Sequence, residues 1–279
     1  MPDSVATTVG RIGLEWRPAT GMQAVERITP AEVAIGLSFN SRPHTVLMAT
    51  PDDVEDLAVG FAVTEGVATP AEIIEVSVER RTDGILADLR LAPAGPARRA
   101  RPRTLEGRSS CGLCGVQRLA DAIRPLPAVT SGAQFSHAAI QRAVAALGPR
   151  QALGGLTRAT HAAGFADVHG ALGLVREDVG RHNALDKLGG ALLQAGVDPA
   201  GGFVVVTSRC SFEMVEKTAR LGCPMIVAVS APTDLAIQRA EAAGVTLVAL
   251  ARADGHTVFS RTDRLVGGQV PTPSEAAHV

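Results

Sequence analysis

The last third of the chain alternates apolar strands with helices, and this pattern constrains the fold more than any other feature. Apolar runs at 203–207, 225–229 and 245–250 read FVVVT, MIVAV and VTLVAL. The helical segments between them begin at Ser211 and Thr233, which are N-capping residue types. Uninterrupted apolar strands separated by such helices are typical of a parallel sheet covered on both faces. The sequence therefore predicts an α/β unit in this region.

Helix signals also mark the middle of the chain. Ser136 is a capping residue type before HAAIQRAVAAL, and Gly148 follows that segment as a stop signal. A short apolar strand is expected at 171–175 and a long helix at 178–195. These elements extend the predicted α/β unit toward the N-terminus.

The N-terminal half carries a different pattern. Thr50, Pro51 and Asp53 form a capping-box sequence before a helical apolar face that ends at Gly66. Turn residues at 40–43 separate two strand-like runs, which predicts a hairpin. The expected strands lie at 32–39, 45–48, 73–78 and 85–91.

Composition marks the boundaries between these units. The segment 92–110 carries three prolines and five arginines, which is typical of a solvated linker. The alternative is a mobile basic arm that presents the next motif to an anionic partner. The expected order is a loose tail (1–21), a small α+β domain (22–91), a mobile basic linker (92–110), an α/β domain (111–266) and a second loose tail (267–279).

The overall balance of residues excludes several classes of protein. The net charge of −1 gives no global electrostatic case for binding nucleic acid or an anionic membrane. Aromatic residues make up 3% of the chain and tyrosine is absent, which argues against base stacking. No run approaches the roughly 18 apolar residues of a membrane span. The first residues lack the apolar core of a signal peptide, so we expect a cytoplasmic protein.

The strongest chemical motif is SSCGLCG, in which Cys111 and Cys114 are three residues apart. Its glycines permit a tight turn, and exposed backbone N–H groups could lower a thiol pKa to give a nucleophilic thiolate. Three interpretations compete: a dithiol redox site, half of a zinc site, and a nucleophile that handles sulfur. A further interpretation is that both cysteines are buried and only structural. This interpretation is disfavoured because the pair follows an arginine-rich linker. Zinc is disfavoured because no second Cys-x-x-Cys supplies further ligands, so no structural metal is predicted.

Three polar segments follow expected strands. The segment 176–187, REDVGRHNALDK, lies at an expected strand-to-helix junction, where a functional role is favoured over a solvated helix face. Ser208, Arg209 and Ser211 follow the strand 203–207 at a helix start, which suits an anion. The segment 250–255, LARADG, follows the last strand of the alternation and by itself indicates only a turn with one arginine.

Taken in order, these motifs resemble a known family. The segments TPDDVEDLAVGFAVTEG, SSCGLCG, REDVGRHNALDKLGG, TSRCSFEMVEKTARLG and VSAPTDLAIQRAEAAGVTLVALAR lie in register over residues 25–265. They are similar to the formate dehydrogenase accessory sulfurtransferases, the FdhD family. Several specific motifs in one register make a chance match untenable.

The resemblance implies a sulfur carrier that takes persulfide sulfur from a cysteine desulfurase. Cys111 corresponds to the persulfide-bearing cysteine, with Cys114 as its partner. The sulfur would pass to the molybdenum bis(molybdopterin guanine dinucleotide) cofactor, a bound substrate that a guanine nucleotide could mimic. The cofactor-binding segment would comprise Leu250, Ala251, Arg252, Ala253, Asp254 and Gly255.

The resemblance also implies a fold and partners. The C-terminal domain is expected to be a cytidine-deaminase-like three-layer α/β domain beside the smaller α+β domain. Deaminase chemistry is not expected, because the chain has no His-x-Glu and Ser110 stands where a proline would precede the first cysteine. The expected partners are a cysteine desulfurase and formate dehydrogenase, with no nucleic acid and no membrane, and a homodimer as a candidate assembly. The alternatives are a non-enzymatic chaperone for the molybdenum cofactor and a Cys-x-x-Cys dithiol redox adaptor.

Overall fold

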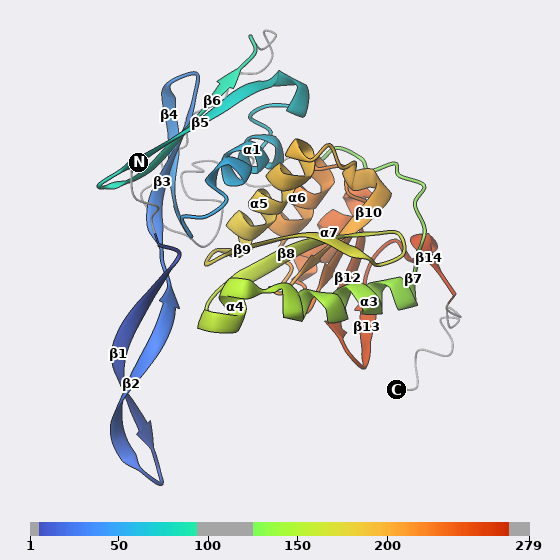
Figure 1. Cartoon of the computed structure of the whole chain (residues 1–279). Helices are drawn as coiled ribbons and strands as arrows, with labels where there is room; N and C mark the ends of the chain where they lie inside the picture. The colour runs from blue at the N-terminus through green and yellow to red at the C-terminus, as the bar shows by residue number, and fades with distance from the viewer. Residues whose placement is uncertain (1–5, 94–124, 268–279) are drawn as a thin grey trace.

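A six-stranded sheet forms the centre of the computed structural model, which describes residues 6–93 and 125–267 (Figure 1). Its strand order is β13-β12-β11-β10-β8-β9. The strands span β8 His161–Asp167, β9 Leu172–Asp178, β10 Gly202–Val206, β11 Met225–Ala228, β12 Thr246–Arg252 and β13 Gly255–Val258.

The predicted parallel arrangement is confirmed for the three central strands. β10 pairs with β11, and β11 with β12, in parallel register. The flanking strands β8, β9 and β13 are antiparallel to their neighbours, so the sheet is mixed. The turns that join β8 to β9 and β12 to β13 are too short for a parallel crossover, which requires an antiparallel return.

Helices cover both faces of this sheet, which gives three layers (Figure 1). On one face pack α5 (Arg181–Gln194), α6 (Phe212–Arg220) and α7 (Asp234–Ala243). On the other face packs α3 (His137–Leu147). Successive residues of β10 alternate between the two cores, with Val204 and Val206 in the first and Phe203 and Val205 in the second. A fully buried central strand explains its continuous apolar sequence.

Smaller elements complete this part of the chain. The short strand β7 (Phe135–Ser136) pairs in parallel with β14 (Leu265–Val266). The short helix α4 (Ala152–Thr157) precedes β8. In the described ranges no helix is long and apolar enough to cross a membrane.

The predicted caps of the C-terminal helices are mostly confirmed. The Ser136 hydroxyl accepts from the Ala139 N–H at 3.1 Å, and the Thr233 hydroxyl accepts from the Ala236 N–H at 3.3 Å. Ser211 occupies the N-cap position of α6, but its side chain does not cap the helix. Its hydroxyl instead donates to Glu213 Oε2 at 2.7 Å.

The N-terminal unit has a sheet and a core of its own. Its strand order is β4-β3-β6-β5, and α1 (Val54–Thr64) packs against one face. The predicted hairpin and the two later strands are confirmed. The strands span β3 Val33–Phe39, β4 Arg42–Ala49, β5 Ile73–Arg81 and β6 Gly84–Leu91.

The capping box predicted before α1 is wrong. The helix begins at Val54 after Asp53, whose φ of 51° is left-handed and whose side chain makes no cap hydrogen bond. The Thr50 hydroxyl accepts instead from the Val179 N–H at 3.1 Å, in the other unit. A contact distant in the sequence has replaced the local one.

The predicted loose tail over 1–21 is also wrong for most of its length. β1 (Thr8–Arg17) and β2 (Gly21–Pro30) form an antiparallel hairpin that extends away from the two sheets (Figure 1). Large apolar side chains alternate along β1 at Ile12, Leu14 and Trp16, and Trp16 lies opposite Met22, a pattern that favours strands. Almost all of the predicted basic linker lies outside the described residues. The predicted second tail also lies outside them from residue 268 onward.

Two glycines allow the helices α1 and α5 to approach closely. A Cβ on Gly60 would lie 1.7 Å from the Asp186 carbonyl oxygen, and a Cβ on Gly190 would lie 2.0 Å from the Asp56 carbonyl oxygen. Both distances are impossible for a real side chain, and both obstacles are backbone atoms. These glycines therefore permit the main contact between the two units.

We expect Gly190→Ala to lower the free energy of unfolding by at least about 2 kcal/mol, because the added methyl must push the helices apart. Chemical denaturation measures the change. The matched control is Gly155→Ala in α4, where nothing lies within 4 Å of the new Cβ. That change should be neutral or stabilising by up to about 1 kcal/mol. Equal stability of the two variants would contradict the close-contact role of Gly190.

Candidate functional site

The carboxyl ends of the three parallel strands form a continuous shelf, made of residues 207–211, 229–233 and 250–252. Backbone hydrogen bonds join the three loops. The Cys210 N–H donates to the Ala231 carbonyl at 3.2 Å, and the Leu250 N–H donates to the Ser230 carbonyl at 3.2 Å. Ligands of open α/β sheets bind at this edge. The shelf is therefore the first candidate for a binding site.

The sequence predicted two arginines for this edge, and the structure places both there. Arg209 follows β10 and Arg252 ends β12, and both side chains are exposed. Neither forms an ion pair with another residue among those described. Ser208 is buried and its hydroxyl donates to the Arg209 carbonyl, so it is already engaged. Two free guanidinium groups on the shelf can serve phosphates or other anions.

The segment 250–255 spans the end of β12 and the turn into β13. Leu250 has a φ of 53°, and the pairing of β12 with β13 is irregular between Ala249 and Arg252. A positive φ is strained for a bulky residue, so the chain leaves regular strand geometry at this position. The segment therefore differs from the plain turn that its sequence indicates.

A histidine and a carboxylate meet where α5 and α6 begin. His182 Nε2 lies 3.5 Å from Glu213 Oε2, and both side chains are 13% exposed. Burial raises the pKa of Glu213, but the neighbouring His182 and the hydrogen bond from Ser211 outweigh burial and lower that pKa overall. Burial and the nearby Arg181 lower the pKa of His161, which keeps its imidazole neutral near pH 7.

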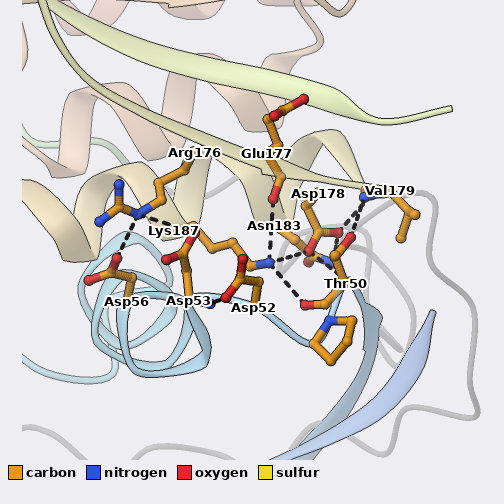
Figure 2. Close-up of polar contacts among 12 residues, drawn as sticks. Thr50, Asp52, Asp53, Asp56, Arg176, Glu177, Asp178, Val179, Asn183 and Lys187 are labelled. Carbon is orange, nitrogen blue, oxygen red and sulfur yellow. Dashed lines mark hydrogen bonds and ion pairs between the residues drawn. The ribbon is translucent and has the colours of Figure 1, made fainter. Parts of the chain in front are cut away.

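The segment 176–187 lies against the loop that precedes α1, as Figure 2 shows. Asp178 and Lys187 form an ion pair with 2.8 Å between Nζ and Oδ2, and both side chains are 0% exposed. Lys187 also donates to the Thr50 carbonyl at 3.0 Å, and Asp178 accepts from the Thr50 N–H at 3.0 Å. Asn183 donates to Asp178 Oδ1 and to the Met48 carbonyl. These bonds join the two units.

Two further charged residues of this segment bind neighbouring elements, Arg176 at the start of α1 and Glu177 at α4. Arg176 Nε lies 2.7 Å from Asp56 Oδ2 and 3.4 Å from Asp53 Oδ2. Glu177 accepts from the backbone N–H groups of Leu153 and Gly154 in α4. The polar run 176–187 therefore fixes the junction of the two units through internal bonds, which is a positioning role and not a solvated face.

A second buried ion pair holds the far end of α1. Lys217 Nζ on α6 lies 2.8 Å from Asp186 Oδ1 and 2.8 Å from Glu65 Oε1. It also donates to the Thr64 hydroxyl at 3.1 Å. Burial lowers the pKa of Lys217, but Asp186 and Glu65 outweigh burial and raise it, so the ammonium group stays charged.

The cysteines divide into two groups. Cys210 and Cys223 are buried, and burial raises the pKa of each thiol to about 12. Such thiols remain protonated at neutral pH and are poor nucleophiles. Cys111 and Cys114 lie outside the described residues. Among those described, no three His, Cys, Asp or Glu side chains converge as a metal site would require.

Sequence reasoning missed the buried ion pairs, although one signal pointed to them. The chain holds 27 lysines and arginines, of which only Lys187 and Lys217 are lysines. Both are buried and paired. Lysine presents a compact charge on a thin stem, whereas arginine needs room for a planar fork. In this arginine-rich chain the two lysines thus coincide with the two buried ion pairs.

Comparisons with known proteins agree over nearly the whole chain. A model of the FdhD/NarQ family matches residues 30–266. A protein named "Sulfur carrier protein FdhD" from Agrobacterium fabrum is 46% identical, over 90% of this chain and 93% of its own. One of the same name from Xanthomonas axonopodis pv. citri is 44% identical, over 95% of this chain and 93% of its own. A crystal structure of a candidate formate dehydrogenase accessory protein from Desulfotalea psychrophila has a TM-score of 0.74 and 25% identity, covering 94% of this chain and 100% of that one.

We expect Lys187→Met to lower the free energy of unfolding by about 3–5 kcal/mol, because it leaves the buried Asp178 carboxylate without its counter-ion. Denaturant titration measures the loss. Arg90→Ala is the matched control, since the Arg90–Glu75 pair is about 60% exposed on both sides; its change should stay within about 0.5 kcal/mol. A similarly small effect in both variants would contradict the role assigned to the buried pair.

Proposed function

This chain belongs to the FdhD/NarQ family, and on that premise we propose that it is a sulfur carrier that supports a formate dehydrogenase. The observation that carries the proposal is the similarity to sulfur carriers over at least 90% of the chain. Sulfur would come from a cysteine desulfurase and go to the molybdenum bis(molybdopterin guanine dinucleotide) cofactor. We also keep the likeness of the sheet domain to cytidine deaminases as a prediction.

Cys111 is the proposed carrier of the sulfur, with Cys114 as its partner. The Cys111 thiolate attacks the outer sulfur of the donor persulfide, a new S–S bond forms on Cys111, and the donor cysteine leaves as a thiolate. On delivery the S–S bond breaks, its electron pair stays on Cys111 as the thiolate, and the outer sulfur leaves in the zero-valent state. The reduced molybdenum of the acceptor would supply the two electrons that convert this sulfur to sulfide. The pKa of about 12 for both Cys210 and Cys223 supports this assignment, because it leaves only the Cys111–Cys114 pair available for thiolate chemistry.

The carboxyl-edge shelf is the proposed docking place of the cofactor. A guanine dinucleotide carries phosphates, and the exposed guanidinium groups of Arg209 and Arg252 can donate to them in pairs. The family resemblance assigns the segment 250–255 to this task. The strained backbone at Leu250 supports the assignment.

Two other functions use the same residues differently. A chaperone would bind the cofactor without accepting sulfur, and a dithiol redox adaptor would cycle Cys111 and Cys114 through a disulfide. The gain of sulfur mass on Cys111 separates the carrier from both. Neither alternative has an observation of its own in its favour.

We expect the peptide that holds Cys111 to gain one sulfur atom in mass when the protein is incubated with cysteine and a desulfurase. Cys111→Ala should abolish the gain and the activation of formate dehydrogenase, because the nucleophile is lost. Cys114→Ala should have the milder effect. Peptide mass spectrometry and an activation assay measure the two results. Normal activation by Cys111→Ala would overturn the assignment.

We expect Arg252→Ala to weaken the binding of GDP by about ten- to a hundredfold, the range for one lost charge-assisted contact of about 1.5–3 kcal/mol. Its Cys111 should still accept sulfur. Titration calorimetry measures the affinity. Arg90→Ala removes an exposed arginine from the other unit and should leave binding within about twofold. Unchanged affinity in Arg252→Ala would mean that the segment 250–255 is only a turn.

A further inference from the structure

Two histidines and a glutamine join the hairpin β12–β13 to α3. His256 Nε2, on β13, lies 2.8 Å from His137 Nδ1 at the start of α3. Its other ring nitrogen, Nδ1, lies 2.8 Å from Gln141 Nε2, one turn further along α3. The two imidazoles are nearly parallel, with an interplanar angle of 18°. Both ring nitrogens of His256 are therefore engaged by α3.

This contact lies where the pairing of the hairpin is irregular. β13 is the edge strand of the sheet. Its regular pairing with β12 is interrupted between Ala249 and Arg252, and Leu250 inside the interruption has a left-handed φ. Within the segment 250–255 the backbone is held by the pairing of Arg252 with Gly255 and by the bond from the Leu250 N–H to the Ser230 carbonyl. His256 directly follows that segment and ties it to the body of the domain.

The hydrogen bonds of this group require a particular count of protons. One proton can lie between His256 Nε2 and His137 Nδ1, so one of these nitrogens must be unprotonated. When the Gln141 amide donates to His256 Nδ1, His256 Nε2 donates to His137. A second proton on His256 is accommodated when the Gln141 side-chain amide turns so that its oxygen accepts that proton. Once both rings are protonated, His256 Nε2 and His137 Nδ1 each carry a proton, and the bond that ties the hairpin to α3 is lost.

We propose that His137, Gln141 and His256 form a pH-sensitive clasp that positions the segment 250–255 for its ligand. The inference rests on the proposed function only in the identity of that ligand, a guanine nucleotide group. At neutral pH the clasp is closed and Arg252 is held at the shelf. Acid opens it and releases the hairpin.

The charges around His256 agree with this behaviour. Burial, and then the neighbouring His137, lower the pKa of His256 below 6.5. On the elements packed against it, Arg252 and Asp254 are exposed, and Arg142 of α3 is bonded to the His169 carbonyl. Because its pKa is lowered, His256 binds fewer protons in the folded state than in the unfolded state. The contribution of His256 to the free energy of unfolding is therefore present above pH 6.5, and it is lost as the pH falls toward the lowered pKa.

Calorimetry with GDP at pH 7.5 and pH 5.5 tests the effect on binding. We expect the wild-type protein to lose about fivefold more affinity at pH 5.5 than His256→Gln, which is the worth of about one hydrogen bond. The charge of the nucleotide changes equally for both proteins and cancels. His169→Gln, an exposed histidine at the β8–β9 turn, should keep the wild-type pH response. An equal response of His256→Gln would overturn the clasp.

Hydrogen exchange without nucleotide tests the clasp separately from the proposed function. After correction for the intrinsic effect of pH, amides of residues 255–258 should lose protection at pH 5.5 in the wild type and not in His256→Gln. Should that variant fail to fold, His137→Gln serves the same purpose. If the exchange protection of these amides does not depend on pH in the wild type, the clasp is contradicted. Absence of GDP binding at both pH values, with exchange as expected, would instead count against the ligand assignment.

Discussion

The buried ion pair between Lys187 and Asp178 is the interaction on which the arrangement of the two units depends. Both groups have left water completely, so each must find all its partners inside the protein. They find them in the loop before α1, through both the N–H and the carbonyl of Thr50. Because an uncompensated buried charge is so unfavourable, few other placements of that loop are tolerated. The pair therefore specifies the relative position of the units more than it stabilises either one.

The same logic is repeated along α1. At its far end the ammonium group of Lys217 binds Asp186, Glu65 and Thr64. Between the two ends, Gly60 and Gly190 bring α1 and α5 into backbone contact. Asp186 and Lys187 are neighbours in the sequence yet serve the two opposite ends. A helix held at both ends and pressed along its length can move only with the sheet domain.

The sequence predicts the elements of this fold better than their contacts. Apolar runs and capping residues identified the four strands of the N-terminal sheet, strands β9 to β12 of the central sheet and most helices, because these signals are local. Strands β8 and β13 were not predicted. The polar contacts join distant positions, such as Thr50 with Asp178 and His137 with His256, which are 128 and 119 residues apart. Periodicity carries no information about them. The capping box at Thr50 failed for this reason, since a distant partner took the hydroxyl group.

The candidate site shows the same division. The carboxyl edge and its two arginines follow from strand order alone, since parallel strands bring their ends together. In the sequence, Cys111 lies between the two units. The chain before it comes from the N-terminal unit, and the chain after it enters the sheet domain. The clamp on α1 therefore limits where both ends of that segment can be. Under the proposed function, separation of the units would alter the approach of Cys111 to the shelf without changing either cysteine. The buried residues of REDVGRHNALDK would thus bear on the proposed sulfur transfer through position alone.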